Sequence, residues 1–93
     1  MTEVFIGAGS NADPERRLLL AVEALERRFG AVRCSRVYRG PAVGAAAADY
    51  LNLVVACEAA LPIDAVRAAL REIETLAGRS RLTQLIIPEV EPT

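Results

Sequence analysis

The sequence predicts a single small domain of the α+β class, in which one antiparallel sheet carries two helices on one face. Its 93 residues leave room for one domain, because a chain of this length fills one hydrophobic core. Apolar residues alternate with polar ones in some segments and recur every three or four residues in two others. Glycine and proline residues separate these segments, and the predicted order is strand, helix, strand, strand, helix, strand.

The first strand is expected over residues 3–8, a β-branched and aromatic run that leads into a glycine-rich turn. A helix is expected over 14–29, since Pro14 suits the first helical position and the Asp13 carboxylate can accept hydrogen bonds from free backbone N–H groups. Gly30 can end this helix. Its apolar face carries Leu18, Val22, Leu25 and Phe29. That face is expected to pack on the sheet.

Two further strands are expected over residues 32–39 and 50–58, joined by a loop of glycine, proline and alanine. In the first of them, one side carries Val32, Cys34 and Tyr38, and the other mostly Arg33, Ser35 and Arg39. In the second, an apolar face carries Leu51, Leu53, Val55 and Cys57, and the opposite face carries Tyr50, Asn52, Val54 and Ala56. Tyr50 and Asn52 are thus expected on one face of the sheet.

The second helix is expected from Pro62 to Gly78, with an apolar stripe at Ile63, Val66, Leu70, Ile73 and Ala77. A last strand is expected over residues 82–87, before Pro88 and a frayed tail. This order of elements is the split βαβ arrangement of a ferredoxin-like α+β sandwich. Because many unrelated proteins share this fold, the fold alone does not indicate a function.

The composition argues against several classes of function. Eleven arginines stand against twelve acidic residues at a net charge of -1, so no basic surface for nucleic acid is expected. No apolar run approaches the roughly 20 residues that span a membrane, and a cytoplasmic protein is expected. The sequence contains no histidine, so chemistry would rest on carboxylates and guanidinium groups. Cys34 and Cys57 lack the CxxC spacing of a zinc site and are expected to be buried apolar residues.

Five sequence blocks occur in an order that is found in one known family. They are Phe5-Ile6-Gly7-Ala8-Gly9-Ser10-Asn11, Tyr38-Arg39-Gly40-Pro41-Ala42-Val43-Gly44, Asp49-Tyr50-Leu51-Asn52, Leu70-Arg71-Glu72-Ile73-Glu74 and Gly78-Arg79-Ser80-Arg81. Together they resemble the 6-hydroxymethyl-7,8-dihydropterin pyrophosphokinase (HPPK) family over residues 1–81 of a single domain, with a divergent last strand and tail over 82–93. The resemblance implies a ferredoxin-like fold. It also implies transfer of pyrophosphate from ATP to a pterin in folate synthesis, with two magnesium ions.

The resemblance implies a pterin-binding wall in the first part of the chain. The matching residues are Gly9, Pro41, Val43, Tyr50 and Asn52, with Gly40 at a position where the family usually has threonine. A pterin is a flat ring with an amide-like edge, and the Asn52 amide can offer it a donor and an acceptor. The alternative for Tyr50 and Asn52 is structural, namely an aromatic ring at the edge of the core and an amide that satisfies neighbouring backbone.

The resemblance also implies nucleotide-binding residues in the second half of the chain. Glu74 and Arg81 match positions near ATP, and Arg71 replaces what is often a glutamine. Arginine suits phosphate because its planar fork can donate two hydrogen bonds to paired oxygens. The alternative for Arg67, Arg71 and Glu74 is a solvated helix face with a weak ion pair.

The segment that holds magnesium in the family, with its Asp-x-Asp strand, has no counterpart in this sequence. Magnesium in phosphoryl transfer is held by carboxylates and phosphate oxygens. Glu89 and Glu91 have the same spacing as such an aspartate pair, and the alternative is that they form an acidic tail between two prolines. We therefore expect no catalytic residue and no metal site. ATP and magnesium are implied only if the protein is an active enzyme.

Three hypotheses of function follow. The first is a shortened HPPK-like protein that binds a pterin, or serves as an accessory subunit, without pyrophosphokinase activity of its own. The second is an active ATP:hydroxymethyldihydropterin pyrophosphotransferase completed by Glu89 and Glu91 or by a partner chain. The third is a structural module that pairs with a second copy through an uncovered sheet face or edge. The expected ligand is a pterin-type small molecule, and the expected protein partner is a second copy or a partner enzyme.

Overall fold

The computed structural model describes residues 2–40, 49–60, 62–78 and 80–85. Along the chain the elements are β1 (Thr2–Ser10), α1 (Pro14–Phe29), β2 (Val32–Cys34), β3 (Tyr38–Gly40), β4 (Tyr50–Ala59), α2 (Ile63–Ala77) and β5 (Ser80–Leu85). The expected loop over residues 41–48 and the predicted end of the last strand at 86–87 lie outside the described residues. No helix in the described part of the chain is long and apolar enough to cross a membrane.

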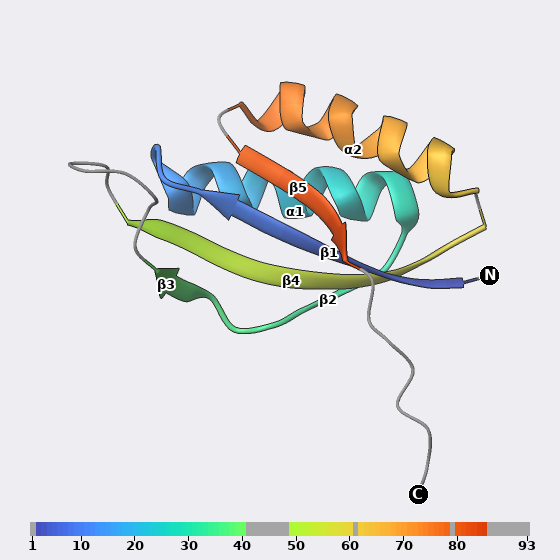
Figure 1. The fold of residues 1–93 in the computed structure, drawn as a ribbon, viewed down its shortest axis with the longest axis horizontal. Helices are drawn as coiled ribbons and strands as arrows, with labels where there is room; N and C mark the ends of the chain where they lie inside the picture. Colours follow the sequence, from blue (N-terminus) through green and yellow to red (C-terminus); the bar gives the residue numbers. More distant parts are fainter. Residues whose placement is uncertain (1, 41–48, 61, 79, 86–93) are drawn as a thin grey trace, which may run out of the picture.

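The strands form one antiparallel sheet in the order β2-β4-β1-β5, and β3 also pairs with β4. β4 lies between β1 and β2, and β1 lies between β4 and β5, so each βαβ unit is split by a strand of the other. Both α1 and α2 cover the same face of the sheet (Figure 1). The predicted ferredoxin-like α+β sandwich is confirmed. The sheet face that neither α1 nor α2 covers is called the open face below.

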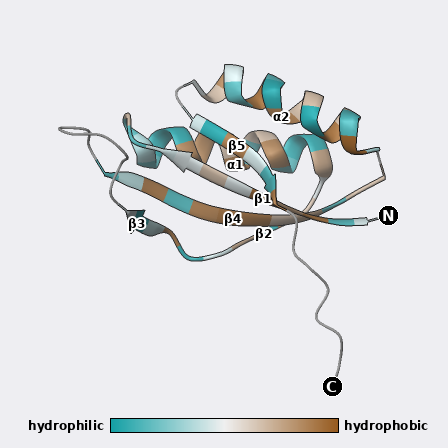
Figure 2. Cartoon of the chain, in the orientation of Figure 1, coloured by the Kyte–Doolittle hydropathy of each residue, from teal (hydrophilic) through white to brown (hydrophobic). Residues whose placement is uncertain are grey.

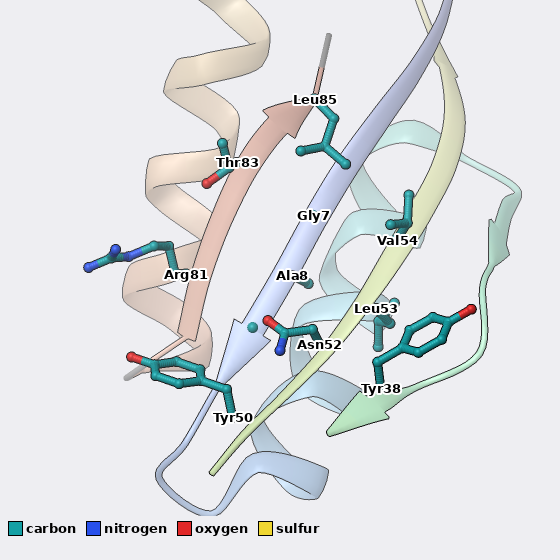
Figure 3. A pocket seen from close by; sticks show the side chains of 11 residues that line it. Gly7, Ala8, Tyr38, Tyr50, Asn52, Leu53, Val54, Arg81, Thr83 and Leu85 are labelled. Carbon is teal, nitrogen blue, oxygen red and sulfur yellow. The ribbon is translucent and has the colours of Figure 1, made fainter. Parts of the chain in front are cut away.

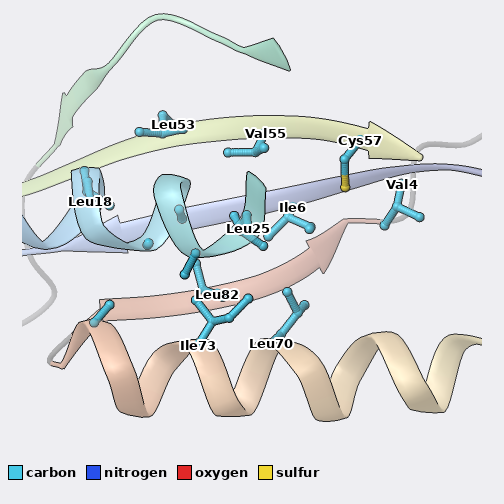
Figure 4. Close-up of a cluster of buried hydrophobic side chains, with 14 of the residues drawn as sticks. Val4, Ile6, Leu18, Leu25, Leu53, Val55, Cys57, Leu70, Ile73 and Leu82 are labelled. Atoms are coloured by element: carbon cyan, nitrogen blue, oxygen red, sulfur yellow. The ribbon is translucent and has the colours of Figure 1, made fainter. Parts of the chain in front are cut away.

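The hydrophobic core lies between the sheet and the two helices. Alternate residues of β1 and β4 face the helices, among them Ile6 and Val55, which are fully buried. The helix residues in this core are Leu18, Ala21, Ala24, Leu25, Val66, Leu70, Ile73 and Ala77 (Figure 4). Hydrophobic residues accordingly run along β4 and along the side of α2 that faces the sheet (Figure 2).

The start of α1 differs in one detail from the prediction. The helix begins at Pro14, as expected, but the Asp13 side chain forms no capping hydrogen bond. Asp13 has φ 48° and ψ 53°, a left-handed conformation, whereas a capping residue usually has extended backbone that presents its side chain to the free N–H groups. The Asp13 carboxylate instead accepts a hydrogen bond from Arg16 Nε at 2.6 Å.

The strand β1 extends further than predicted because its glycines remain in the sheet. Gly7 and Gly9 each lie opposite a residue of β4 on one side and a residue of β5 on the other. Pairing on both sides satisfies the backbone groups of an extended segment. The turn that the sequence places at Gly7 therefore begins only after Ser10.

The strand predicted over residues 32–39 is divided into β2 and β3 by a bulge at residues 35–37. Ser35 attaches this bulge to β4. Its backbone N–H donates to the Val54 carbonyl oxygen at 2.8 Å. The Ser35 hydroxyl in turn accepts a hydrogen bond from the Val54 N–H, also at 2.8 Å. A serine side chain thus takes the place of one backbone partner in the ladder.

The bulge reverses the faces of the residues that follow it. Cys34 pairs with Val55, and Tyr38 pairs with Asn52, so the segment between Cys34 and Tyr38 has one residue more than the segment of β4 that it faces. Because the side-chain period of a strand is two, one extra residue moves the next side chain to the other face. Tyr38, predicted on the same side as Cys34, therefore lies on the open face.

The two cysteines are free and lie in different surroundings. Cys34 is exposed on the short strand β2, which corrects the expectation that both cysteines are buried. Cys57 is buried, and this burial raises the pKa of its thiol. The register sets Cys57 opposite Val32 and Cys34 opposite Val55, so the two cysteines are not cross-strand partners.

Candidate functional site

A pocket of about 710 Å³ lies on the open face of the sheet. This volume is within the range of small-molecule sites. The pocket, called the open-face pocket, is lined by Gly7, Ala8, Gly9, Tyr38, Tyr50, Asn52, Leu53, Val54, Arg81, Thr83 and Leu85 (Figure 3). These residues come from four strands, β1, β3, β4 and β5.

Two glycines of β1 form the floor of this pocket. A Cβ atom built on Gly9 would lie 2.6 Å from Asn52 Oδ1, so a side chain at this position would displace the Asn52 amide from its place over β1. A Cβ atom on Gly7 would lie 3.4 Å from Leu85 Cδ2, an ordinary contact with a flexible side chain. The side chains of Asn52 on β4 and Leu85 on β5 therefore lie beside a central strand that presents backbone alone at these two positions (Figure 3).

The polar groups of the pocket on β4 are Tyr50 and Asn52. Asn52 is exposed, and Tyr50 is half-buried. Asn52 lies opposite Gly9 of β1 and opposite Tyr38 of β3, and Tyr50 lies opposite Gly40. The Tyr50 ring reaches across the end of β1 toward β5 (Figure 3). The carboxamide and the phenol thus offer hydrogen-bonding groups beside an uncovered stretch of backbone.

The wall formed by β5 adds one charged and one hydroxyl side chain. Arg81 lies opposite Gly9, and Thr83 lies opposite Gly7. Both side chains are exposed. Arg81 is the one charged side chain that lines the pocket in the described part of the chain.

The other two residues expected near a nucleotide lie on α2 and do not line the pocket. Glu74 is half-buried, and its Oε2 accepts a hydrogen bond from the Leu82 backbone N–H at 2.9 Å. Arg71 is exposed, and its carbonyl oxygen accepts a hydrogen bond from Thr75 Oγ1 at 3.1 Å. The structure therefore brings Arg81 together with Tyr50 and Asn52, and places Arg71 and Glu74 elsewhere.

Four of the expected site residues, Pro41, Val43, Glu89 and Glu91, lie outside the described residues. Within the described ranges, no group of three or more histidine, cysteine, aspartate or glutamate residues could hold a metal ion. These residues therefore do not fit a magnesium site, and no magnesium ligand is assigned.

The pocket also contains residues that the sequence did not single out as binding residues, among them Gly7, Tyr38, Thr83 and Leu85. Gly7, Thr83 and Leu85 follow from alternation, because they stand two or four residues from Gly9 or Arg81 on the same strands. Tyr38 could not be found in this way, because the bulge before it reverses its face.

The fold and the pocket define a ferredoxin-like α+β protein with a small-molecule-sized pocket on its open sheet face. The family model for 7,8-dihydro-6-hydroxymethylpterin-pyrophosphokinase (HPPK) matches residues 5–89, and the chain belongs to this family. The match confirms the resemblance carried by the five sequence blocks and continues beyond Arg81. A search of curated proteins found no match to the chain. Membership of the family supports a function related to pterin pyrophosphokinases.

Proposed function

We propose that this protein binds a pterin in the open-face pocket, with the Asn52 carboxamide facing the polar edge of the ring. The observation that carries this proposal is the close approach of Asn52 Oδ1 to Gly9, where a Cβ atom would lie only 2.6 Å away. The amide therefore lies over the pocket floor. Family membership supports the choice of a pterin over other flat heterocycles.

The chemistry of a pterin suits the groups that line the pocket. The ring is flat, so it can lie close to backbone where Gly7 and Gly9 project no side chain. Its amide-like edge needs a donor and an acceptor side by side, which one asparagine carboxamide supplies. Tyr50 and Tyr38 offer aromatic surface at two sides of the pocket. From the family resemblance, Pro41 and Val43 complete the site in this proposal. Gly40 pairs with Tyr50 but does not itself line the pocket.

The finer part of the proposal is that the protein binds the pterin, alone or as an accessory subunit, without transferring pyrophosphate by itself. Magnesium in phosphoryl transfer needs carboxylate and phosphate oxygens as ligands. The lining residues that the structure describes carry no carboxylate. Carboxylates supplied by Glu89 and Glu91, or by a partner chain, are the alternative that an activity assay tests.

Calorimetric titration of the protein with 6-hydroxymethylpterin tests binding. We expect measurable heat and a raised melting temperature, and at least a tenfold weaker affinity for Asn52→Ala, which is roughly the loss of one or two hydrogen bonds. Glu58→Ala, an exposed change on the same strand outside the pocket, is the control and should bind like the wild type. The absence of both heat and a thermal shift at millimolar pterin would contradict the proposal.

Catalysis is tested by an assay that measures the release of AMP from ATP in the presence of hydroxymethyldihydropterin and magnesium. Background turnover alongside measurable pterin binding supports the finer proposal. Turnover that disappears in the variant with Glu89→Gln and Glu91→Gln would instead assign these carboxylates to the metal.

A further inference from the structure

A second pocket, of about 480 Å³, lies at the end of the sheet where β1 begins and α1 ends (Figure 1). This volume is also within the range of small-molecule sites. The pocket, called the end pocket, is lined by residues of β1, β2, β4 and the end of α1, among them Glu3, Phe29, Arg33, Ala56 and Glu58. It shares no lining residue with the open-face pocket. A ligand of the end pocket can therefore bind without displacing a pterin.

Two carboxylates of the end pocket face each other across neighbouring strands. Glu3 of β1 lies directly opposite Glu58 of β4. Both belong to the open face, because the residues next to them, Val4 and Cys57, face the core. Directly opposed residues of an antiparallel pair have Cβ atoms about 5 Å apart, and like charges in this arrangement repel each other. A positive charge placed between the two carboxylates would remove this repulsion.

The end pocket has one guanidinium group, and Glu3 already engages it. Arg33 Nη2 donates a hydrogen bond to Glu3 Oε2. Arg33 lies opposite Ala56, so this ion pair crosses β4 on the open face. None of the ion pairs within the described ranges includes Glu58. With two carboxylates and one guanidinium group, the lining has an excess of one negative charge, which resides on Glu58.

The end pocket also offers apolar surface beside this charge. Phe29 is partly buried against the hydrophobic core and lines the pocket. Small residues, Gly30, Ala31 and Ala56, form part of the remaining lining and leave the space unfilled. The face of an aromatic ring attracts a cation within about 6 Å of its centre. A metal ion fits this lining less well, because no three metal-binding side chains lie together in the described part of the chain.

We propose that the end pocket binds a primary organic amine, whose ammonium group lies between Glu58 and Glu3 and whose apolar part contacts Phe29. A primary ammonium group has three N–H donors, and carboxylate oxygens accept them in charge-assisted hydrogen bonds. Such a ligand neutralises the excess charge of the lining and covers the exposed side of the ring. This inference is independent of the proposed function, because it concerns a different pocket.

The test compares phenethylamine with 2-phenylethanol, which has the same shape and no charge. Heteronuclear NMR of the isotope-labelled protein gives both affinities, and the amide signals that move identify the site. We expect the amine to bind about tenfold more tightly than the alcohol and to move the signals of Phe29, Ala31 and Glu58. Saturation with 6-hydroxymethylpterin should change the affinity for the amine by less than about twofold.

Three variants test the role of each charge. Glu58→Gln should remove the preference for the amine, whereas Glu23→Gln, an exposed change on α1 that does not line the end pocket, should keep it. Arg33→Gln should bind the amine about threefold or more tightly than the wild type, because it frees the second carboxylate. Thermal unfolding checks the fold of each variant, and Glu58→Gln should not lower the melting temperature, since it removes a like-charge repulsion.

The outcomes distinguish this inference from its alternatives. Equal affinities for the amine and the alcohol, or a preference that survives Glu58→Gln, would show that the carboxylate does not select the charge. Signals that move at Asn52 and Arg81 would place the amine in the open-face pocket and also overturn the inference. Displacement of the amine by magnesium chloride at constant ionic strength would assign the carboxylates to an inorganic cation. Amine binding without pterin binding would contradict the proposed function alone, and the reverse would contradict this inference alone.

Discussion

At the scale of single residues, Gly9 determines how the open-face pocket is built. It is buried although it belongs to the open face, because the Asn52 side chain lies over it. Its backbone does not adopt a positive φ, so alanine is compatible with the backbone conformation at this position. The reason for a glycine here is therefore the space above it.

We predict that Gly9→Ala weakens pterin binding by about tenfold or more and leaves the free energy of unfolding within about 1 kcal/mol of the wild type. The added methyl group would displace the Asn52 amide, whose Oδ1 would otherwise lie 2.6 Å from it. Gly7→Ala is the control, because its methyl group meets only the flexible Leu85 side chain at 3.4 Å. Calorimetry and thermal unfolding measure both effects, and equal affinities for the two variants would contradict this role of Gly9.

A second prediction at this scale concerns the pH dependence of stability. Burial raises the pKa of Cys57 in the folded protein, so the unfolded chain releases this proton first as the pH rises. The stabilising contribution is complete below the thiol pKa of the unfolded chain, near 9.0, and is lost as the pH rises through the folded value. The slope for one proton is at most about 1.4 kcal/mol per pH unit.

Urea unfolding of Cys57→Ala and of Cys34→Ala across this pH range isolates the effect. The Cys57 variant should lose less stability at alkaline pH than the wild type, whereas the variant of the exposed Cys34 should follow the wild type. Identical alkaline profiles for all three proteins would show that Cys57 ionises equally easily in both states.

At the scale of elements, the bulge between β2 and β3 marks where prediction from the sequence stops. The alternation along residues 50–58 and the stripes of both helices gave the right faces, because each follows one unbroken period. The exception is Ile63 in the first turn of α2, which belongs to the predicted apolar stripe but is exposed. From the alternation, Tyr50 and Asn52 could therefore be placed on one face, whereas Gly9 was grouped with them only through the family resemblance. Tyr38 could not be placed correctly, because the extra residue in the bulge reverses the face on which its side chain lies. A single extra residue in a polar stretch cannot be recognised from the composition. The left-handed Asp13 is a similar case of local backbone that the residue type does not reveal.

We predict that Ser35→Ala lowers the free energy of unfolding by about 1 kcal/mol and weakens pterin binding through Tyr38. The variant loses the hydrogen bond of 2.8 Å from the Val54 N–H to Ser35 Oγ, which attaches the bulge. Ser35→Thr keeps the hydroxyl and should restore both properties. Urea unfolding and calorimetry check the expectation, and full stability of the alanine variant would mean that the backbone alone holds the bulge.

At the scale of the whole molecule, both outer strands of the sheet have features that discourage pairing with another chain. On β5, the Leu82 N–H donates to the Glu74 carboxylate and is occupied. On the other side, the bulge interrupts the strand, and Arg33, Arg36 and Arg39 are exposed along it. Charged residues and bulges on edge strands oppose association through the edges. A structural module that dimerises through an edge therefore has less support than a pterin-binding protein.

We predict that the protein sediments as a monomer at micromolar concentration and that Glu74→Ala shifts it toward dimers, because the variant frees the Leu82 N–H on the outer edge of β5. Glu72→Ala, an exposed change on the same helix, should stay monomeric. Sedimentation velocity distinguishes these outcomes, and a wild-type dimer would revive the edge-pairing hypothesis.

The central position of β1 has a consequence for hydrogen exchange. Gly7 and Gly9 lie opposite residues of β4 and β5 at once, so their amides become exposed only when the sheet itself opens. Tyr38 and Gly40 belong to a strand of three residues, and local opening there requires far less free energy. The floor of the pocket is thus expected to persist while one of its walls opens and closes, and a bound ligand would slow exchange at that wall far more than beneath the ring.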